Sequence, residues 1–320
     1  MGAERIMTAV LEARPPATGA GRPAGPGRRA GRPWRRGEKL LGSLLAVSAA
    51  LFFLNVIYLL LAGRRSGLLL AVFQIMPVVV VVGHASLSKG WRRGLLFASL
   101  CFFPGLAAEV LGVRYGLLFG GHYAYLEVDV AFGGVPLIIP VFWVVFIYIC
   151  HSMVNTFLLF LGRERPAAGR GGVLELALLV ALDGVLVVII DVIMDPLMVK
   201  AGKWEWAAGG PYYGVPLGNF VGWFALACLA SGSFRLVEYL RPRPEPAFAR
   251  RFHLVPAAGY ATALFGFLAY AINIDMPQII PAALALMGPV LAANLMLYSG
   301  IARERLAGEA LLAGDYGVRP

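Results

Sequence analysis

Long runs of apolar residues, separated by short charged or glycine-rich segments, repeat along most of the chain. A helix that crosses the hydrocarbon of a bilayer needs about 20 apolar residues. Runs of this kind are expected to form helices at 40–61, 68–87, 94–112, 135–161, 173–199, 215–239, 254–273 and 277–299. Backbone groups in lipid must satisfy their own hydrogen bonds, so each run is predicted to be a helix rather than a strand. The pattern predicts an all-α, polytopic membrane helix bundle with about eight transmembrane helices.

Composition supports this fold class and excludes several others. Of the 320 residues, 59% are hydrophobic and only 14% are charged, whereas soluble domains carry about 25% charged residues. An ordinary soluble enzyme and a disordered regulator are therefore excluded. The cysteines lie inside apolar runs without CxxC spacing, which indicates core side chains rather than disulfides or a zinc site.

The distribution of basic residues predicts the topology. The net charge is +10, but the basic residues lie in short runs between apolar segments, which is typical of membrane topology and not of nucleic-acid binding. With the N-terminus inside, the outer loops hold only Arg64, Arg65, Arg114, Lys200 and Lys203, and all other Lys and Arg residues lie inside. We therefore expect a multi-pass protein of the plasma membrane with both termini in the cytoplasm.

Three parts of the chain follow from this topology. Residues 1–38, rich in Ala, Gly, Pro and Arg, are predicted to be a disordered basic tail. Residues 39–300 form the transmembrane domain, and residues 301–320 form a cytoplasmic C-terminal tail.

An internal repeat marks the two outer loops that are richest in glycine and aromatic residues. Residues 134–143 and 214–223 share the pattern GVPL followed by Trp seven residues after the proline. An aromatic-x-aromatic pair precedes each copy, so the repeated unit is predicted to be helix–loop–helix, with the third and fourth helices matching the fifth and sixth. Pro136 and Pro216 are expected to open the second helix of each unit. The repeated aromatic residues are Tyr123, Tyr125 and Trp143 in the first copy and Trp204, Trp206 and Trp223 in the second. A shared pocket between the two units is predicted, and the alternative is an aromatic belt at the membrane interface.

Ionisable residues inside the predicted spans are the candidates for chemistry, because burying them in the membrane is costly. Asp191 and Asp195 lie four residues apart and share a helix face. Asp183 is roughly on the same stripe, and Glu109 is the expected opposing group. Such carboxyl groups can donate a proton as a general acid or hold Mg²⁺ on a diphosphate, and the structural alternative is pairing with Arg or Lys.

Histidines add less to this picture. His122 lies in the first aromatic loop and is included with Asn219 among the residues expected to contact substrate. His84 and His151 are expected to be hydrogen-bonded interior side chains. The spacing of the histidines gives no metal-binding pattern, so no metal is expected.

Three segments resemble a known family. These are GHYAYLE at 121–127, GVPLIIPVFW at 134–143 and DPLMVKAGKWEWAAGGPYYGVPLGNFVGW from Asp195 to Trp223. They look like segments of the bacterial and archaeal carotenoid-biosynthesis membrane proteins that act as C-1,2 hydratases on acyclic carotenoid ends, such as the gamma-carotene and bisanhydrobacterioruberin hydratases. The resemblance covers about residues 95–300, and its most specific part begins at Asp195.

The resemblance implies addition of water across the terminal double bond of a long apolar carotenoid, without a cofactor. It also implies a substrate that enters from the bilayer and other carotenoid-pathway enzymes as partners. The site residues are assigned by chemistry. Protonation of the alkene gives a tertiary cation, so we expect Asp195 or Asp191 to be the acid and Glu109 to position water. The aromatic residues of the repeat would surround the cation.

Other functions stay open at this point. A carotenoid end-group cyclase would form the same cation. An intramembrane prenyltransferase would use the Asp191 and Asp195 pair, although it usually needs two aspartate-rich motifs on the cytoplasmic side. A transporter is compatible with repeats and intramembrane acids.

Overall fold

The computed structural model describes residues 36–62, 67–126, 130–160, 170–242 and 254–315. The described part contains α2 (Arg36–Ala62), α3 (Gly67–Lys89), α4 (Trp91–Tyr115), α5 (Ile138–Phe160), α6 (Arg170–Lys200), α7 (Leu217–Leu240), α8 (Val255–Asn273) and α9 (Ile280–Asp315). Short strands β1 (Tyr123–Tyr125), β2 (Ala131–Phe132), β3 (Val135–Pro136) and β4 (Trp204–Trp206) and the 3-10 turn η2 (Pro277–Ile279) connect them. The prediction of an all-α polytopic bundle is confirmed.

Helices of membrane-spanning length and composition dominate the described residues. Among these residues, six stretches qualify: Trp91–Tyr115, Ile138–Thr156, Gly172–Lys200, Leu217–Leu240, Val255–Asn273 and Pro277–Leu297. Pro77–Lys89 of α3 is a shorter apolar stretch. The chain is thus a multi-pass membrane protein.

Two predicted helix boundaries differ from the structure. Pro136 was expected to open a helix, but it pairs with Ala131 in the β2–β3 hairpin, and α5 begins only at Ile138. Pro216, in contrast, is the N-cap residue of α7. The last helix was expected to end near 299, yet α9 continues to Asp315, because the added residues are mostly Ala, Leu, Glu and Arg, which favour helix.

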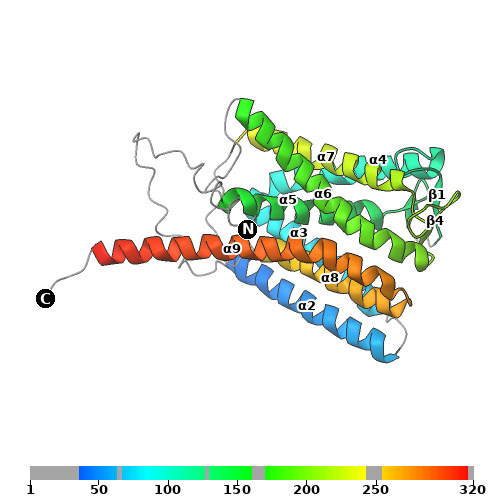
Figure 1. Cartoon of the computed structure of the whole chain (residues 1–320), viewed down its shortest axis with the longest axis horizontal. Coiled ribbons are helices and arrows are strands. Elements are labelled where there is room, and N and C mark those ends of the chain that lie inside the picture. The colour runs from blue at the N-terminus through cyan, green and yellow to red at the C-terminus, as the bar shows by residue number, and fades with distance from the viewer. Residues whose placement is uncertain (1–35, 63–66, 127–129, 161–169, 243–253, 316–320) are drawn as a thin grey trace, which may run out of the picture.

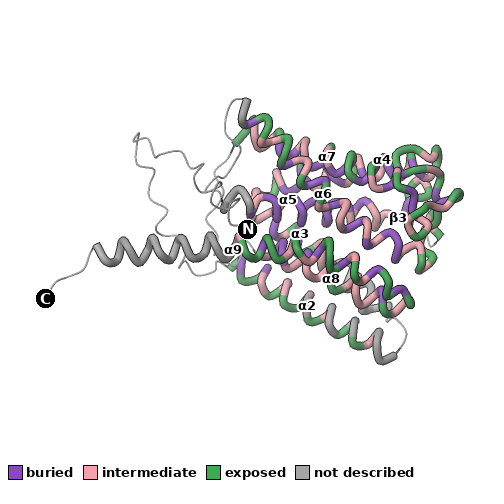
Figure 2. Tube along the Cα trace, viewed as in Figure 1, coloured by how far each residue is buried: buried purple, intermediate pink, exposed green. Residues whose placement is uncertain are grey.

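The central element of the bundle is α5. It contacts α3, α4, α6, α7, α8 and α9, and residues 143–150 are buried without a break. A helix that is apolar and buried on every side belongs to the core of a bundle. Figure 1 shows α4 and α7 on one side of α5 and α2, α8 and α9 on the other, with α6 running obliquely across α5. Figure 2 shows that buried residues follow the inner faces of these helices.

Close helix packing depends on small residues at a few positions. A Cβ atom on Gly184 of α6 would come within 2.7 Å of the Cys228 sulfur on α7. A Cβ atom on Gly105 of α4 would come within 3.2 Å of the Trp143 ring on α5. Small residues let membrane helices approach closely, and these contacts bring α4, α5, α6 and α7 together around the site.

The two ends of the bundle differ. One end, here called the loop end, carries residues 116–126, 130–137 and 201–216, with strands β1 to β4 of the described part (Figure 1). The opposite end, here called the ionic end, carries the salt bridge between Lys89 and Glu238 and the one between Asp183 and Arg235. The predicted basic tail lies outside the described residues up to position 35.

Candidate functional site

The aromatic-x-aromatic pairs of the repeat form a two-stranded ribbon at the loop end. Strand β1 pairs antiparallel with β4, with Tyr123 opposite Trp206 and Tyr125 opposite Trp204. The paired rings lie 5.5 Å and 5.6 Å apart, centroid to centroid. The Trp206 indole N–H donates to the Phe119 carbonyl at 2.9 Å. Residues far apart in the sequence thus form one aromatic wall.

The two GVPL segments start with the same local turn. Phe132 pairs with Val135 in the first copy, and Tyr212 pairs with Val215 in the second. Both central residues of each turn have positive φ: 64° and 88° for Gly133 and Gly134, and 52° and 87° for Tyr213 and Gly214. Such turns match the twist of a tight hairpin, and they direct α5 and α7 into the bundle beside each other.

The tryptophans of the repeat meet where these helices descend. The rings of Trp143 and Trp223 are stacked, with centroids 3.9 Å apart. Both side chains are buried. The stack closes one side of the space between α4, α5, α6 and α7.

Glu109 of α4 is buried at this point and is held by three neutral donors. The hydroxyls of Tyr123 and Tyr125 donate to its Oε2 at 2.5 Å and 2.7 Å. The indole N–H of Trp143 donates to Oε1 at 2.9 Å. A carboxylate accepts up to about four hydrogen bonds, so these donors suit an ionised group, and Oε1 keeps room for a further partner.

The tyrosine donors remain protonated. Tyr123 and Tyr125 lie in β1, outside the membrane-spanning helices. Burial, together with the neighbouring Glu109 carboxylate, raises the pKa of both hydroxyls above the usual value of about 10. Both side chains therefore act as hydrogen-bond donors to Glu109 at any physiological pH.

A second group of carboxyls lies across the site on α6. The Asn219 side-chain amide, in the first turn of α7, donates to Asp191 Oδ2 at 2.9 Å and to Asp195 Oδ2 at 2.6 Å. All three side chains are at most 2% exposed. Asp191 Oδ1 is a buried oxygen without a hydrogen-bond partner among the described residues. One amide thus fixes two carboxyl groups one helical turn apart.

A cavity of about 670 Å³ connects these groups. At the loop end its lining contains Glu109, Asp195, Asn219, Tyr123, Tyr125, Trp143, Trp204, Trp206 and Trp223. Elsewhere the lining is largely apolar and comes from α3, α5 and α8. Nine of the residues that the sequence singled out therefore line one space.

Two predicted site residues lie outside this lining. Asp191 is fully buried and absent from the lining, and it shares the Asn219 amide with Asp195. His122 is exposed at the loop end. Neither side chain borders the cavity.

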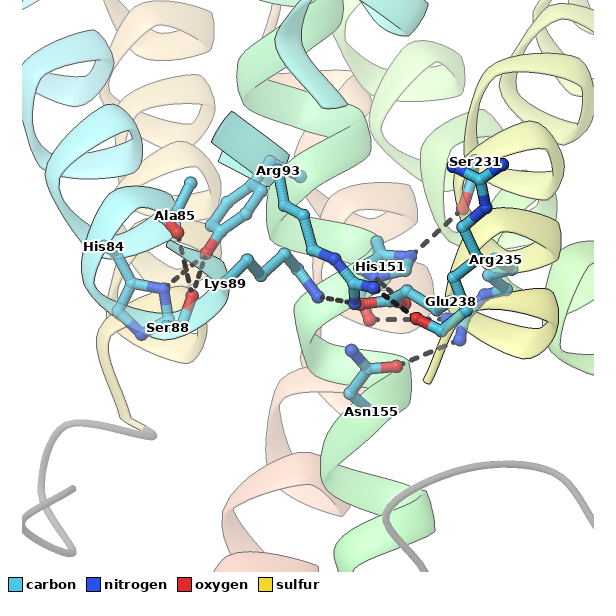
Figure 3. Close-up of polar contacts among 12 residues, drawn as sticks. His84, Ala85, Ser88, Lys89, Arg93, His151, Asn155, Ser231, Arg235 and Glu238 are labelled. Atoms are coloured by element: carbon cyan, nitrogen blue, oxygen red, sulfur yellow. Dashed lines mark hydrogen bonds and ion pairs between the residues drawn. The ribbon is translucent and has the colours of Figure 1, made fainter. Parts of the chain in front are cut away.

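Asp183 belongs to a different cluster from Asp191 and Asp195. Arg235 donates from Nε and Nη2 to the two Asp183 oxygens, at 2.6 Å and 2.7 Å. Ser231 also donates to Asp183. His151 Nδ1 lies 3.2 Å from the Ser231 hydroxyl, and Figure 3 shows the two side chains pointing toward each other. The sequence interpretation missed this pairing because Arg235 was assigned to the end of a span, whereas it is 4% exposed inside α7. Asp183 is thus a paired structural charge and does not extend the carboxylate line.

The sequence interpretation also missed one wall of the cavity. Residues of α8 from Val255 to Tyr270 line it at every third or fourth position, including Gly259, Ala263 and Gly266. The available signal was this stripe of small residues on one helix face. His84 and Tyr148, which also line the cavity, lie toward the ionic end.

Comparison with known proteins adds one finding. Residues 67–292 match the family model described as carotenoid biosynthesis protein. No curated protein matches the chain, and no solved structure does.

Proposed function

The chain belongs to the carotenoid biosynthesis protein family, and we propose that it is a hydratase that adds water across the terminal C-1,2 double bond of an acyclic carotenoid. One observation carries this proposal. Two carboxyl groups, Asp195 and Glu109, border the same aromatic cavity from different helices. Among the described residues, both are held by neutral donors only.

Asp195 is the proposed acid. Two carboxyl groups that share a buried site cannot both ionise without strong repulsion, and Asp191 is bound to the same amide one turn away. One proton is therefore retained by the pair. Asp195 is the member that borders the cavity, so it delivers this proton to C-2 of the double bond, whose π electrons form the new C–H bond.

The aromatic wall would stabilise the cation that forms at C-1. An aromatic face attracts a cation within about 6 Å, by about 2 kcal/mol or more when water is excluded. Trp143, Trp223 and Trp206 are each at most 7% exposed and border the cavity beside the carboxyl groups. The ring faces act only on the charged state, which is how a site lowers a barrier.

Glu109 is the proposed base for water. Its Oε1 accepts one hydrogen bond, from Trp143, and can accept another from a water molecule. The water oxygen bonds to C-1 and its proton passes to Glu109, which gives a tertiary alcohol. Transfer of this proton back to Asp195 restores the starting state. The net change is one water added, with no oxidation or reduction.

Two rival reactions differ in what they need from the site. A cyclase would use the same acid and aromatic wall but would end by losing a proton instead of binding water. A prenyltransferase would need both aspartates on one diphosphate-bound metal, and Asp191 does not border the cavity. Glu109 Oε1 accepts only one hydrogen bond among the described residues and so leaves room for a water molecule, which favours hydration.

The charge distribution gives the proposed placement. With the basic residues inside, the loop end faces the outer side of the plasma membrane and the ionic end faces the cytoplasm. The substrate would enter sideways from the bilayer, and enzymes that supply acyclic carotenoids would act before it.

Expression in a lycopene-producing bacterium, followed by mass spectrometry of the extracted carotenoids, tests the reaction. A hydratase adds the mass of one water for each modified end. An unchanged mass with a shifted absorption spectrum would identify a cyclase. Unchanged carotenoids in cells that contain the folded protein would contradict both.

A further inference from the structure

The cavity is bordered on one side by a helix of the outer layer. Helices α3 and α8 both pack on the central helix α5, whereas α2 packs on α3 and α8. Nevertheless, Leu45 and Ser48 of α2 border the cavity together with residues of α3 and α8. A side chain of an outer helix can border an inner cavity only where the inner helices leave a gap. The junction of α3 with α8, here called the seam, is therefore open at the level of Leu45 and Ser48.

The seam is closed toward the ionic end. Leu41 of α2, Val80 of α3 and Val255 of α8 form a cluster of buried side chains. Close to this cluster, a Cβ atom on Gly259 of α8 would come within 3.0 Å of the Ile149 side chain on α5. Helices α2, α3, α5 and α8 thus pack tightly at this end, and the cavity has no opening to lipid here among the described residues.

Toward the loop end the seam widens. Pro77 of α3 and Thr262 and Gly266 of α8 border the cavity and are only half-buried. Among the α2 side chains that the structure describes, none beyond Ser48 borders the cavity. Figure 1 shows α2 running away from α8 toward the loop end. Ser48, Pro77, Thr262 and Gly266 therefore frame an opening, here called the portal.

The portal faces the bilayer. Val79 of α3 and Phe265 of α8 are close in sequence to its frame and are 40% and 51% exposed. Both belong to long apolar helices, so their exposed faces are expected to contact lipid. A molecule that moves through the portal thus passes directly between the hydrocarbon of the membrane and the cavity.

The polar groups of the portal are satisfied within their own helices. The Ser48 hydroxyl donates to the Leu44 carbonyl at 2.7 Å, and the Thr262 hydroxyl donates to the Ala258 carbonyl at 2.9 Å. In membrane proteins such hydroxyls can also bond across helices, but these two do not tie α2 to α8. A hydrocarbon can therefore pass them without breaking a hydrogen bond between helices, which would be costly.

An apolar path leads from the portal to the carboxyl groups. The Phe142 and Phe146 rings of α5 are stacked with centroids 5.7 Å apart, and both border the cavity. The next residue after Phe142 is Trp143, whose indole donates to Glu109. Among the described lining residues, the acidic and basic ones are Glu109, Asp195 and Lys203, all toward the loop end. A polyene thus meets apolar walls until it reaches the site.

We propose that an acyclic carotenoid enters and leaves the cavity through the portal between α3 and α8, and that Ser48 and Thr262 set the width of this passage. The inference rests on the proposed function for the identity of the ligand. Apolar surface is driven out of water, so a passage that opens directly to lipid spares the polyene exposure at either end of the bundle.

Binding kinetics test the portal. A passage controls how fast a ligand enters and leaves, but it does not change the stability of the bound state. The purified protein in lipid nanodiscs is mixed with lycopene, and quenching of the cavity tryptophans Trp143, Trp206 and Trp223 reports binding. Ser48→Phe narrows the portal, so we expect association and dissociation rates that both fall about tenfold, with a dissociation constant within about threefold of the wild type.

Val47→Phe is the matched control for this variant. Val47 is the preceding residue of α2, is 49% exposed and does not border the cavity, so both rates should stay unchanged. Thr262→Phe narrows the portal from α8 and should act like Ser48→Phe. Its control is Ile272→Phe, because Ile272 lies on the same helix, is 56% exposed and does not border the cavity.

Two results would overturn the portal. One is unchanged rates in both Ser48→Phe and Thr262→Phe, with the folds intact by circular dichroism. The other is a weaker dissociation constant with an unchanged association rate, because the two residues would then belong to the wall around the bound ligand. If lycopene gains no water but the rates respond as expected, the proposed reaction fails and the portal stands.

Discussion

The two ends of the bundle both bury carboxyl groups, but they neutralise them in different ways. At the ionic end, Asp183 binds the Arg235 guanidinium through both oxygens, and Glu238 lies 2.8 Å from the Lys89 ammonium. At the loop end, no salt bridge of the described residues reaches Glu109, Asp191 or Asp195. Neutral tyrosine, tryptophan and asparagine groups hold them instead.

We propose that this difference separates carboxyl groups with a structural role from those with a chemical role. A carboxylate paired with a guanidinium is fixed in its ionised form and contributes specificity to helix packing. A carboxyl group held by neutral donors beside a cavity can still exchange a proton with a bound molecule. Burial and membrane depth alone do not distinguish the two cases, whereas the identity of the partners does.

The sharpest test of the comparison is Asp195→Asn. The amide keeps the size of the side chain but cannot donate an acidic proton, so we expect hydration to fall by about 10²- to 10⁴-fold with little change in the amount of folded protein. Product formation per mole of folded protein measures the effect. A fully active variant would remove Asp195 from the mechanism.

Glu109→Gln should have the next largest effect. Loss of the base is expected to slow hydration by about 10²-fold, less than loss of the acid, because water can also release its proton to solvent. The same product assay measures it, with Glu205→Gln as a control, since Glu205 is exposed on β4. Equal activities for the two variants would contradict a role of Glu109 in the reaction.

At the ionic end, Asp183→Asn should reduce stability rather than chemistry. It leaves the buried Arg235 without its carboxylate partner, so we expect a loss of about 3 kcal/mol in the free energy of unfolding. Activity per folded molecule should be retained. Thermal unfolding in detergent measures the change, and the double variant Asp183→Leu with Arg235→Met should regain part of it. Loss of specific activity without loss of stability would contradict a purely structural role for Asp183.

Trp223→Leu tests the aromatic wall. Removal of one ring from the stack with Trp143 should reduce the hydration rate about tenfold, which corresponds to about 1.4 kcal/mol of cation stabilisation. Trp91→Leu is the matched control, because Trp91 of α4 is 65% exposed and does not border the cavity. Similar rates for both variants would show that the rings only fill space.

The smallest expected effect is an alkaline loss of stability at the loop end. The raised pKa of Tyr125 in the fold means that its stabilising contribution is fully present below the unfolded pKa of about 10 and is lost as pH rises above it. The melting temperature of the wild type should therefore fall between about pH 9.5 and 11. Tyr125→Phe should lessen this fall, and Tyr115→Phe, at an exposed position, should not.

The sequence could predict the features that depend on residue patterns within one segment. Apolar runs identified the helices, and the repeated GVPL segments pointed to the aromatic residues that now border one cavity with Glu109 and Asp195. The features that it could not predict depend on which helices become neighbours. Arg235 of α7 forms a salt bridge with Asp183 of α6, and the cavity combines lining residues of α8 with those of α3 and α5. No spacing within one segment encodes such contacts.

The antiparallel pairing of β1 with β4 also has a consequence for biosynthesis. The ribosome makes α4, β1 and α5 before α6 and β4. Until β4 is made, β1 lacks the strand with which it pairs, and Glu109 lacks the proposed acid on α6. Contacts between distant segments form late and slowly. A nascent chain that holds only the first unit therefore has the proposed base without the proposed acid, and the proposed catalytic pair is complete only after the second unit has been inserted beside it.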